Sequence, residues 1–205
     1  MQKTDLKTTL DGYRAKAGEF RDLVVPPQRY LLLDGHGDPN SSPAFTTAVE
    51  TLYPLAYALK YASRRLLERD FVVMPLEGLW WADDHAVFTT ARDAAQWDWT
   101  LMLLQPDWID EAMYAEAVAA VAAKKSLERL ADVRFEVFDE GRCVQTLHRG
   151  PFDAEGPVLA RLHDEVLPTR GLRPTGRHHE IYFSDPRRGA PEKRRTILRQ
   201  SVAAA

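Results

Sequence analysis

The sequence predicts an α+β fold in which two βαββ units follow each other along the chain. The order strand, glycine turn, helix, strand, strand occurs in residues 28–104 and again in residues 143–200. Each copy also has a glutamate followed within three residues by an aromatic residue, at Glu77 and at Glu180. This duplication predicts a pseudo-twofold axis and two antiparallel sheets side by side, with a ligand groove on one face and helices on the opposite face.

The composition fits an ordinary globular protein that binds neither nucleic acid nor a membrane. The 205 residues carry a net charge of −3, which gives no electrostatic argument for an anionic partner. No apolar run approaches membrane-spanning length, and the charged N-terminus does not resemble a signal peptide. A single cysteine, Cys143, excludes an internal disulfide and fits a reducing compartment. We expect a cytoplasmic protein, for which a monomer is plausible.

We expect one domain over residues 1–205, made of an N-terminal arm (1–27), a first unit (28–104), a linking helix (107–131) and a second unit (134–200). The arm is polar and mixed, and it forms either a short helix or a strap around the body. Residues 28–34 predict a strand that stops at the glycine-rich turn 35–39. This turn lacks the spacing of a nucleotide-binding loop and predicts no phosphate site.

The first long helix starts at Ser42-Pro43, because serine caps a helix well and proline suits its first position. We expect it to reach about Arg69, with a bend at Pro54. One flank carries a tyrosine at every fourth position: Tyr53, Tyr57 and Tyr61. Aligned tyrosines usually serve packing, and they become site candidates only if this flank faces a cavity.

Two strands follow the first helix. Residues 71–81 predict an edge or bulged strand, because Pro75 cannot donate a ladder hydrogen bond. The next strand places Trp97 and Trp99 on one face. The linking helix 107–131 is rich in alanine, the strongest helix former.

The second unit repeats this order. Residues 134–138 and 143–148 predict a hairpin, and residues 154–167 predict a helix. The strand 177–184 follows, and residues 196–200 supply the last strand.

The strand 177–184 contains the main site candidate, the pair Glu180 and Tyr182. Side chains alternate along a strand, so one face carries His179, Ile181 and Phe183, and the other carries His178, Glu180 and Tyr182. We expect the first face to pack on the helices and the second to face the groove. The alternative is that Glu180 is simply solvated on the wet face of an antiparallel sheet.

The repeat suggests that Glu77 joins Glu180 near the floor of the groove. The candidate ligand-binding residues are Glu77, Trp80, Trp97, Trp99, Tyr53 and Tyr57. Aromatic walls around a carboxylate suit flat ligands that are apolar or cationic. For each tryptophan taken singly, core packing is the competing interpretation.

The remaining motifs predict no metal and no cofactor. His178-His179-Glu180 lies on a strand and lacks the spacing of a helical zinc motif. Asp83-Asp84-His85 lies in a polar loop, where solvation is the simpler interpretation. Cys143 has no evident catalytic partner, and no serine lies in a GxSxG elbow.

The sequence resembles the GyrI-like small-molecule-binding family, and in particular its stand-alone branch. The matching segments are Thr4–Lys7, Leu33–Pro39, Pro75–Trp80, His179–Arg188 and Pro191–Lys193. The resemblance implies two βαββ units around a groove and a key glutamate at Glu180. It also implies a protective hydrolase, because members of the stand-alone branch hydrolyse cyclopropanoid DNA-alkylating natural products.

Two classes of function therefore remain open. In an enzyme, Glu180 activates the water that opens a cyclopropane conjugated to a dienone, and Tyr182 donates a hydrogen bond to the carbonyl oxygen. In a binding protein, the same groove holds a small molecule without chemistry, for effector sensing or drug sequestration. We expect no direct contact with DNA, because the residues before Gln28 are too few for a winged helix.

Overall fold

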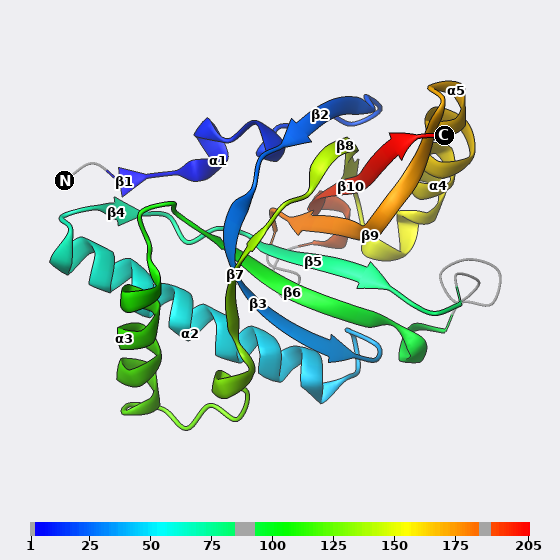
Figure 1. The fold of residues 1–205 in the computed structure, drawn as a ribbon. Helices are drawn as coiled ribbons and strands as arrows, with labels where there is room; N and C mark the ends of the chain where they lie inside the picture. The colour runs from blue at the N-terminus through cyan, green and yellow to red at the C-terminus, as the bar shows by residue number, and fades with distance from the viewer. Residues whose placement is uncertain (1–2, 85–92, 185–189) are drawn as a thin grey trace.

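The computed structural model describes residues 3–84, 93–184 and 190–205 (Figure 1). Its centre is an antiparallel sheet of eight strands in the order β2-β8-β10-β9-β5-β6-β3-β7. These strands are β2 (Arg21–Val25), β3 (Gln28–His36), β5 (Leu76–Trp81), β6 (Asp98–Gln105), β7 (Arg134–Phe138), β8 (Gly141–Arg149), β9 (Leu172–Tyr182) and β10 (Arg195–Ala204). A separate parallel pair joins β1 (Lys3–Thr4) to β4 (Asp70–Phe71).

The helices differ strongly in length. They are α1 (Leu6–Thr9), α2 (Pro43–Leu66), α3 (Glu111–Ala122), α4 (Gly156–Ala160), the π-helical segment Arg161–Val166 and α5 (Leu167–Thr169). Helix α2 begins at Pro43, as predicted. Helix α3 is shorter than the predicted linking helix at both ends, and its later start is explained by Asp110, whose side chain accepts the amide hydrogen of Met113. In the described parts of the chain, no helix is both long and apolar enough to cross a membrane.

The two halves of the sheet meet where β5 pairs with β9. In this register Leu76 lies opposite Tyr182, and Gly78 lies opposite Glu180. One half contains β5, β6, β3 and β7, and the other contains β9, β10, β8 and β2. The predicted α+β class with antiparallel strands is confirmed, and the two predicted sheets are joined edge to edge as one.

Each half of the sheet has as its outer strand one that precedes the other half in the sequence: β2 lies beside β8, and β7 lies beside β3. Strand β7 pairs with β3, and β8 pairs with β2, so the hairpin predicted for residues 134–148 is wrong. Glu140, in the link between β7 and β8, provides the reason. Its carboxylate is buried against His179 and Arg199, whereas a hairpin turn would have held it in solvent.

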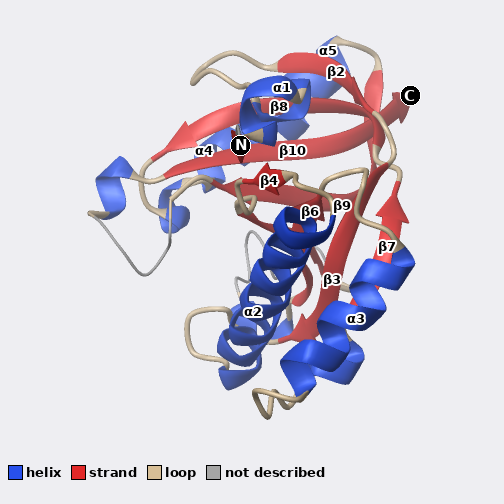
Figure 2. Ribbon diagram, turned by 90° about the vertical axis from the view of Figure 1, so that its left-hand side faces the viewer, coloured by secondary structure: helices blue, strands red, loops and turns tan. Residues whose placement is uncertain are grey.

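Two apolar layers enclose the first half of the sheet. Figure 2 shows α2 and α3 beside each other on one face, where they cover Leu31, Leu33, Leu101 and Leu103. The N-terminal arm covers the other face, where Tyr13 packs in a cluster with other buried residues, namely Tyr30, Leu32, Leu79, Met102 and Ile181. The core is therefore three layers thick at the junction of the halves.

A chain of buried ion pairs crosses the sheet beneath the arm. Oε2 of Glu77 lies 3.0 Å from Nε2 of His179, and Nδ1 of His179 lies 2.9 Å from Oε1 of Glu140. Oε2 of Glu140 accepts a hydrogen bond of 2.7 Å from Arg199. We call these four residues the buried ion-pair chain. Each of their side chains is at most 1% exposed.

The buried ion-pair chain also holds the arm in place. The Tyr13 hydroxyl donates to Oε1 of Glu77. Nη2 of Arg199 donates to the Gly12 carbonyl at 2.6 Å, and its Nε donates to Gln145 at 2.8 Å. Removing one member of such a set leaves the others buried without a partner, so the arm and the sheet depend on each other.

The charges in this chain balance when His179 is protonated. Burial opposes its positive charge, but Glu140 and Glu77 outweigh burial and raise the pKa of His179 to about 9. Burial likewise opposes ionisation of Glu140, but His179 and Arg199 outweigh it and lower the pKa of this carboxyl to about 2. Two carboxylates thus face two cations.

These pKa shifts predict how stability depends on pH. The contribution of His179 to the free energy of unfolding is complete below its ordinary pKa of 6.5 and is lost as the pH rises through about 9. The contribution of Glu140 is complete above its ordinary pKa of 4.5 and is lost as the pH falls towards about 2. In thermal melts over pH, we expect highest stability at about pH 5 to 6.5 and a loss of about 3 kcal/mol by about pH 9.5.

The variant His179→Gln should lack the alkaline decline, whereas His36→Gln should keep it, because His36 pairs with Asp98 at the surface. If stability still falls at alkaline pH in His179→Gln, a group other than His179 causes the fall.

Candidate functional site

The candidate site lies on the central strands, at the junction of the two halves. Strand β9 places His178, Glu180 and Tyr182 on one face, next to Gly78 and Trp80 of β5. Residues that lie directly opposite each other on adjacent strands point to the same face of the sheet. The structure therefore brings three of the predicted residues together: Glu180, Tyr182 and Trp80.

The face that carries Glu180 is the one covered by α2. Tyr182 packs in the same cluster as Leu52 and Leu55 of α2, whereas Ile181 packs with Tyr13 of the arm. We expected the reverse, with Ile181 on the helices. The alternation along the strand was correct, but alternation does not reveal which face a distant helix covers.

A chain of hydrogen bonds orients Glu180. Nε1 of Trp80 donates to the Tyr182 hydroxyl at 2.9 Å, and this hydroxyl donates to Oε2 of Glu180 at 2.7 Å. The Glu180 side chain is only 14% exposed. Burial raises the pKa of Tyr182 well above its ordinary value, with Glu180 as the next cause, so the phenol keeps its proton and remains a donor.

Gly78 makes this hydrogen-bond chain possible. A Cβ at this position would lie 2.8 Å from Nε1 of Trp80 and 3.3 Å from the Tyr182 hydroxyl. The indole of Trp80 therefore lies across the bare backbone of Gly78 to reach Tyr182. A larger residue at position 78 would push the ring away.

Aromatic residues from both halves surround Trp80 and Tyr182. The Trp80 ring stacks on the ring of Phe45 of α2, with 6.3 Å between the ring centroids, and makes an edge-on contact with Trp97, with 5.9 Å between the centroids. Phe152, from the short helix Phe152–Ala154, meets Tyr182 edge-on at 5.5 Å. Our sequence prediction missed Phe45 and Phe152. For Phe152 the sequence did contain a signal. This residue follows Gly150, which the repeat aligns with the glycine turn of the first unit.

Two predicted site residues lie elsewhere. Trp99 is fully buried over Gly35 and donates its indole N–H to the Gly37 carbonyl at 3.1 Å, so it belongs to the core. Glu77 points to the opposite face of the sheet, into the buried ion-pair chain. The repeat aligned Glu77 with Glu180, but Glu77 pairs with Ile181, and this offset of one residue reverses its face.

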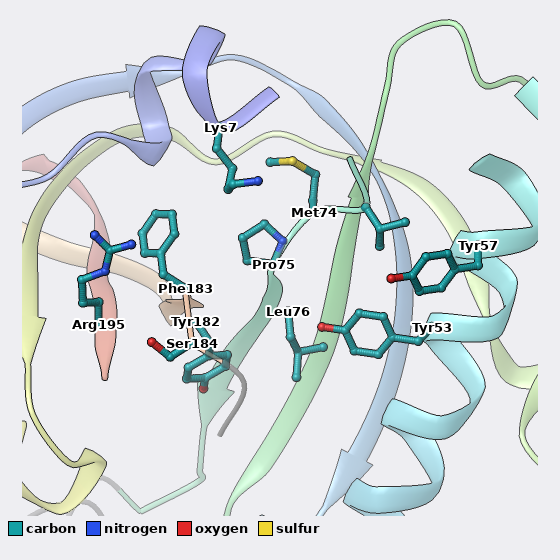
Figure 3. Close-up of a pocket in the computed structure, with 11 residues that line it drawn as sticks. Lys7, Tyr53, Tyr57, Met74, Pro75, Leu76, Tyr182, Phe183, Ser184 and Arg195 are labelled. Atoms are coloured by element: carbon teal, nitrogen blue, oxygen red, sulfur yellow. The ribbon is translucent and has the colours of Figure 1, made fainter. Parts of the chain in front are cut away.

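A pocket of about 280 Å³ adjoins the hydrogen-bonded residues. Figure 3 shows Tyr53 and Tyr57 of α2 pointing their hydroxyls towards it from one side. Lys7 of the arm and Arg195 of β10 lie at its other side, and Tyr182 forms part of its wall. Tyr182 thus belongs to the pocket and to the hydrogen-bond chain at once.

The charges in this region are separated. Among the described residues that line the pocket, Lys7 and Arg195 are the charged ones, and neither is acidic. Lys7 pairs with Asp5 at 2.8 Å, and the Arg195 guanidinium lies 5.4 Å from the Phe183 ring. The carboxylate of Glu180 lies beyond Tyr182. The described lining of the pocket is therefore basic, and the carboxylate of Glu180 lies next to it, bonded to the Tyr182 hydroxyl.

The described residues contain no group of three or more His, Cys, Asp and Glu side chains that could hold a metal ion. His85 lies outside the described residues. Burial raises the pKa of the Cys143 thiol to about 12, so this group stays protonated at neutral pH. The described side chains of this region include a carboxylate, a phenol, an imidazole, two basic groups and aromatic rings.

The fold and the groove together define a small-molecule-binding protein. The model of the GyrI-like small molecule binding domain matches residues 99–198. The chain belongs to the GyrI-like small-molecule-binding family. It is 37% identical to an uncharacterized conserved protein from Listeria innocua, over 98% of this chain and 100% of that one, with a TM-score of 0.87.

Two further structures extend the comparison. A hydrolase from Listeria innocua is 36% identical, over 98% of this chain and 100% of that one, with a TM-score of 0.85. The C-terminal domain of EcmrR is 11% identical, over 91% of this chain and 98% of that one, with a TM-score of 0.56, and shares the fold alone. No curated protein matches the chain.

The close approach at Gly78 yields a direct test of the site geometry. We expect Gly78→Ala to displace the Trp80 indole, break its hydrogen bond to Tyr182 and lower the free energy of unfolding by about 1–3 kcal/mol. Thermal melts and tryptophan fluorescence measure both effects. Gly156→Ala is the control, because a Cβ there has no neighbour within 4 Å. Wild-type fluorescence in Gly78→Ala would contradict the packing described.

Proposed function

We propose that this protein binds a flat, largely apolar small molecule in the groove and hydrolyses an electrophilic cyclopropane within it, protecting the cell from reactive compounds. The observation that carries the proposal is the hydrogen-bond chain Trp80–Tyr182–Glu180, which holds a carboxylate beside an aromatic pocket. The resemblance to the stand-alone branch supports it. Two structures described as hydrolases from Listeria innocua, 36% and 35% identical, give further support.

Glu180 is proposed as the general base. It accepts a proton from water while the water oxygen bonds to a cyclopropane carbon. The opposing carbon–carbon bond breaks, and its electrons move into the conjugated dienone, whose oxygen becomes a phenolate. The proton on Glu180 then returns to solvent or to the phenolate, which restores the carboxylate.

Tyr182 has a different proposed role from the one that its sequence position suggests. The Tyr182 hydroxyl donates its one proton to Oε2 of Glu180. To donate to a ligand oxygen, it would have to break this hydrogen bond first. We assign Tyr182 to orienting Glu180, which leaves Oε1 for water. Charge on the ligand oxygen is instead stabilised by the basic residues of the pocket wall, Lys7 and Arg195.

A second candidate function is binding without chemistry, as an effector-binding or drug-sequestering protein. One observation favours it: Tyr182 lines the pocket, but Glu180 does not. A ligand held between Tyr53, Tyr57 and Tyr182 would then have no contact with the carboxylate. Turnover of a cyclopropanoid probe distinguishes the two functions, because a binding protein retains the probe unchanged.

The variant Glu180→Gln tests the hydrolase. With a spirocyclopropane dienone as probe, we expect turnover to fall by about 10²–10⁴-fold and affinity to change by less than about tenfold, because shape is kept while basicity is lost. Product formation over several equivalents per protein is the measurement. Glu136→Gln is the control, since this carboxylate is exposed on β7.

Two outcomes would refute this mechanism: a wild-type protein that only retains the probe, or a Glu180→Gln variant with the wild-type rate. Glu77→Gln is not a suitable control for the carboxylate, because Glu77 belongs to the buried ion-pair chain. We expect its main effect to be lower stability.

The separation of charge predicts the preferred ligands. Because the pocket wall contains Lys7 and Arg195, we expect 2-naphthamide and 2-naphthoate to bind more tightly than (2-naphthyl)methylammonium, by about tenfold at low salt. Quenching of tryptophan fluorescence measures the affinities. Arg195→Gln should reduce this preference and Arg65→Gln, in the last turn of α2, should not. Tighter binding of the cation would instead indicate that the carboxylate of Glu180, among its aromatic neighbours, determines which ligands bind.

A further inference from the structure

Three partly or fully buried side chains near Glu180 carry polar atoms without a hydrogen-bond partner in the described parts of the chain. They are the hydroxyls of Thr146 and Thr196 and both ring nitrogens of His178. Thr146 is 1% exposed and Thr196 is fully buried. The His178 side chain is 17% exposed, but both of its nitrogens are shielded from solvent.

The register of the strands places all three on the face that carries Glu180. Thr196 of β10 lies opposite Tyr182, and Leu198 lies opposite Glu180. Thr146 of β8 lies opposite Leu198 on its other side. His178 precedes Glu180 by two residues, and its Nε2 lies 3.5 Å from Oε1 of Glu180, too far for a good hydrogen bond. Along β9, His178 and Thr196 therefore lie on either side of Glu180, and Thr146 lies two strands away from Glu180 on the same face.

Such an arrangement is unfavourable unless something else binds there. A buried polar group without a partner costs free energy, because it has lost its hydrogen bonds to water. Valine has nearly the same shape as threonine, prefers strands and would avoid this cost. Two threonines at neighbouring buried positions therefore indicate that their hydroxyls bind a group from outside the protein.

We propose that Thr146, Thr196 and His178 form a polar subsite that holds ordered water beside Glu180. Each buried water needs two to four polar partners, and two hydroxyls, an imidazole and a carboxylate supply such partners along this face of the sheet. The subsite deepens the proposed function: it supplies the second reactant of the hydrolysis from the polar half of the groove. The aromatic residues on the other half hold the organic ligand. The water donates its proton to Oε1 of Glu180 as its oxygen bonds to carbon.

Isosteric substitutions test the subsite. We expect Thr196→Val and Thr146→Val each to leave the melting temperature within about 2 °C of the wild-type value, because the side-chain shape is kept and the released water forms its hydrogen bonds in bulk solvent. Each should also lower kcat for the spirocyclopropane dienone by about tenfold or more and leave KM nearly unchanged, because water rather than ligand is lost. A lower rate at unchanged stability is not the effect of damaged folding.

Thr100→Val is the matched control. Thr100 is also buried in a strand, but it lies on the other face and donates to Oδ1 of Asp34 at 2.6 Å. This variant should lower the melting temperature and leave kcat unchanged. If Thr196→Val and Thr146→Val behave like Thr100→Val, with lower stability and normal kcat, the subsite is refuted and the hydrolase stands.

A crystal structure at about 1.2 Å resolution tests water binding without turnover. We expect one water within about 3 Å of the Thr196 hydroxyl and another within about 3 Å of a His178 nitrogen, and loss of the first in the Thr146→Val/Thr196→Val double variant. Hydroxyls bonded to backbone carbonyls, with no water between them, would overturn the subsite whatever the kinetics. Water at this position in a protein that does not turn over the probe would support the subsite and refute the hydrolase.

Discussion

The buried ion-pair chain is the constraint on which the rest of the structure depends. Its members come from β5, β9, β10 and the link between β7 and β8, so it joins elements that are far apart in sequence. Breaking a buried pair costs about 3–5 kcal/mol, because the remaining charge has no partner. His179 can meet Glu77 and Glu140 only in one register of β9. That register places Glu180 on the groove side, and a slip by one residue would move it under the arm.

The two faces of β5 and β9 therefore have separate tasks. Glu77 and His179 hold the arm and the two halves together on one face. Gly78, Glu180 and Tyr182 lie on the other face, beside the pocket that Tyr182 lines. Because adjacent residues of a strand point in opposite directions, a structural residue and a candidate catalytic residue follow each other in the sequence. A substitution at Glu77 or His179 thus changes stability first and the groove only indirectly.

The pseudo-twofold arrangement does not make the groove symmetric. Around Glu180, the first unit contributes aromatic rings, including Phe45 and Trp80. On the same face of the sheet, the second unit contributes the buried hydroxyls of Thr146 and Thr196. This division suits a reaction between a flat organic molecule and water, because each reactant meets a surface of its own polarity.

The sequence by itself determined the α+β class, the start of α2 at Ser42-Pro43 and the common face of Glu180 and Tyr182. These features depend on local rules, namely turn residues, helix capping and the alternation of side chains along a strand. Only the tertiary structure decided the exchange of β2 and β7, the burial of Trp99 and the place of Glu77. Each of these depends on contacts between distant segments, such as the pairing of Glu77 with His179 across 102 positions. A repeat in the sequence aligned the two glutamates, but the pairing of β5 with β9 offset them by one residue, and one residue is enough to reverse a face.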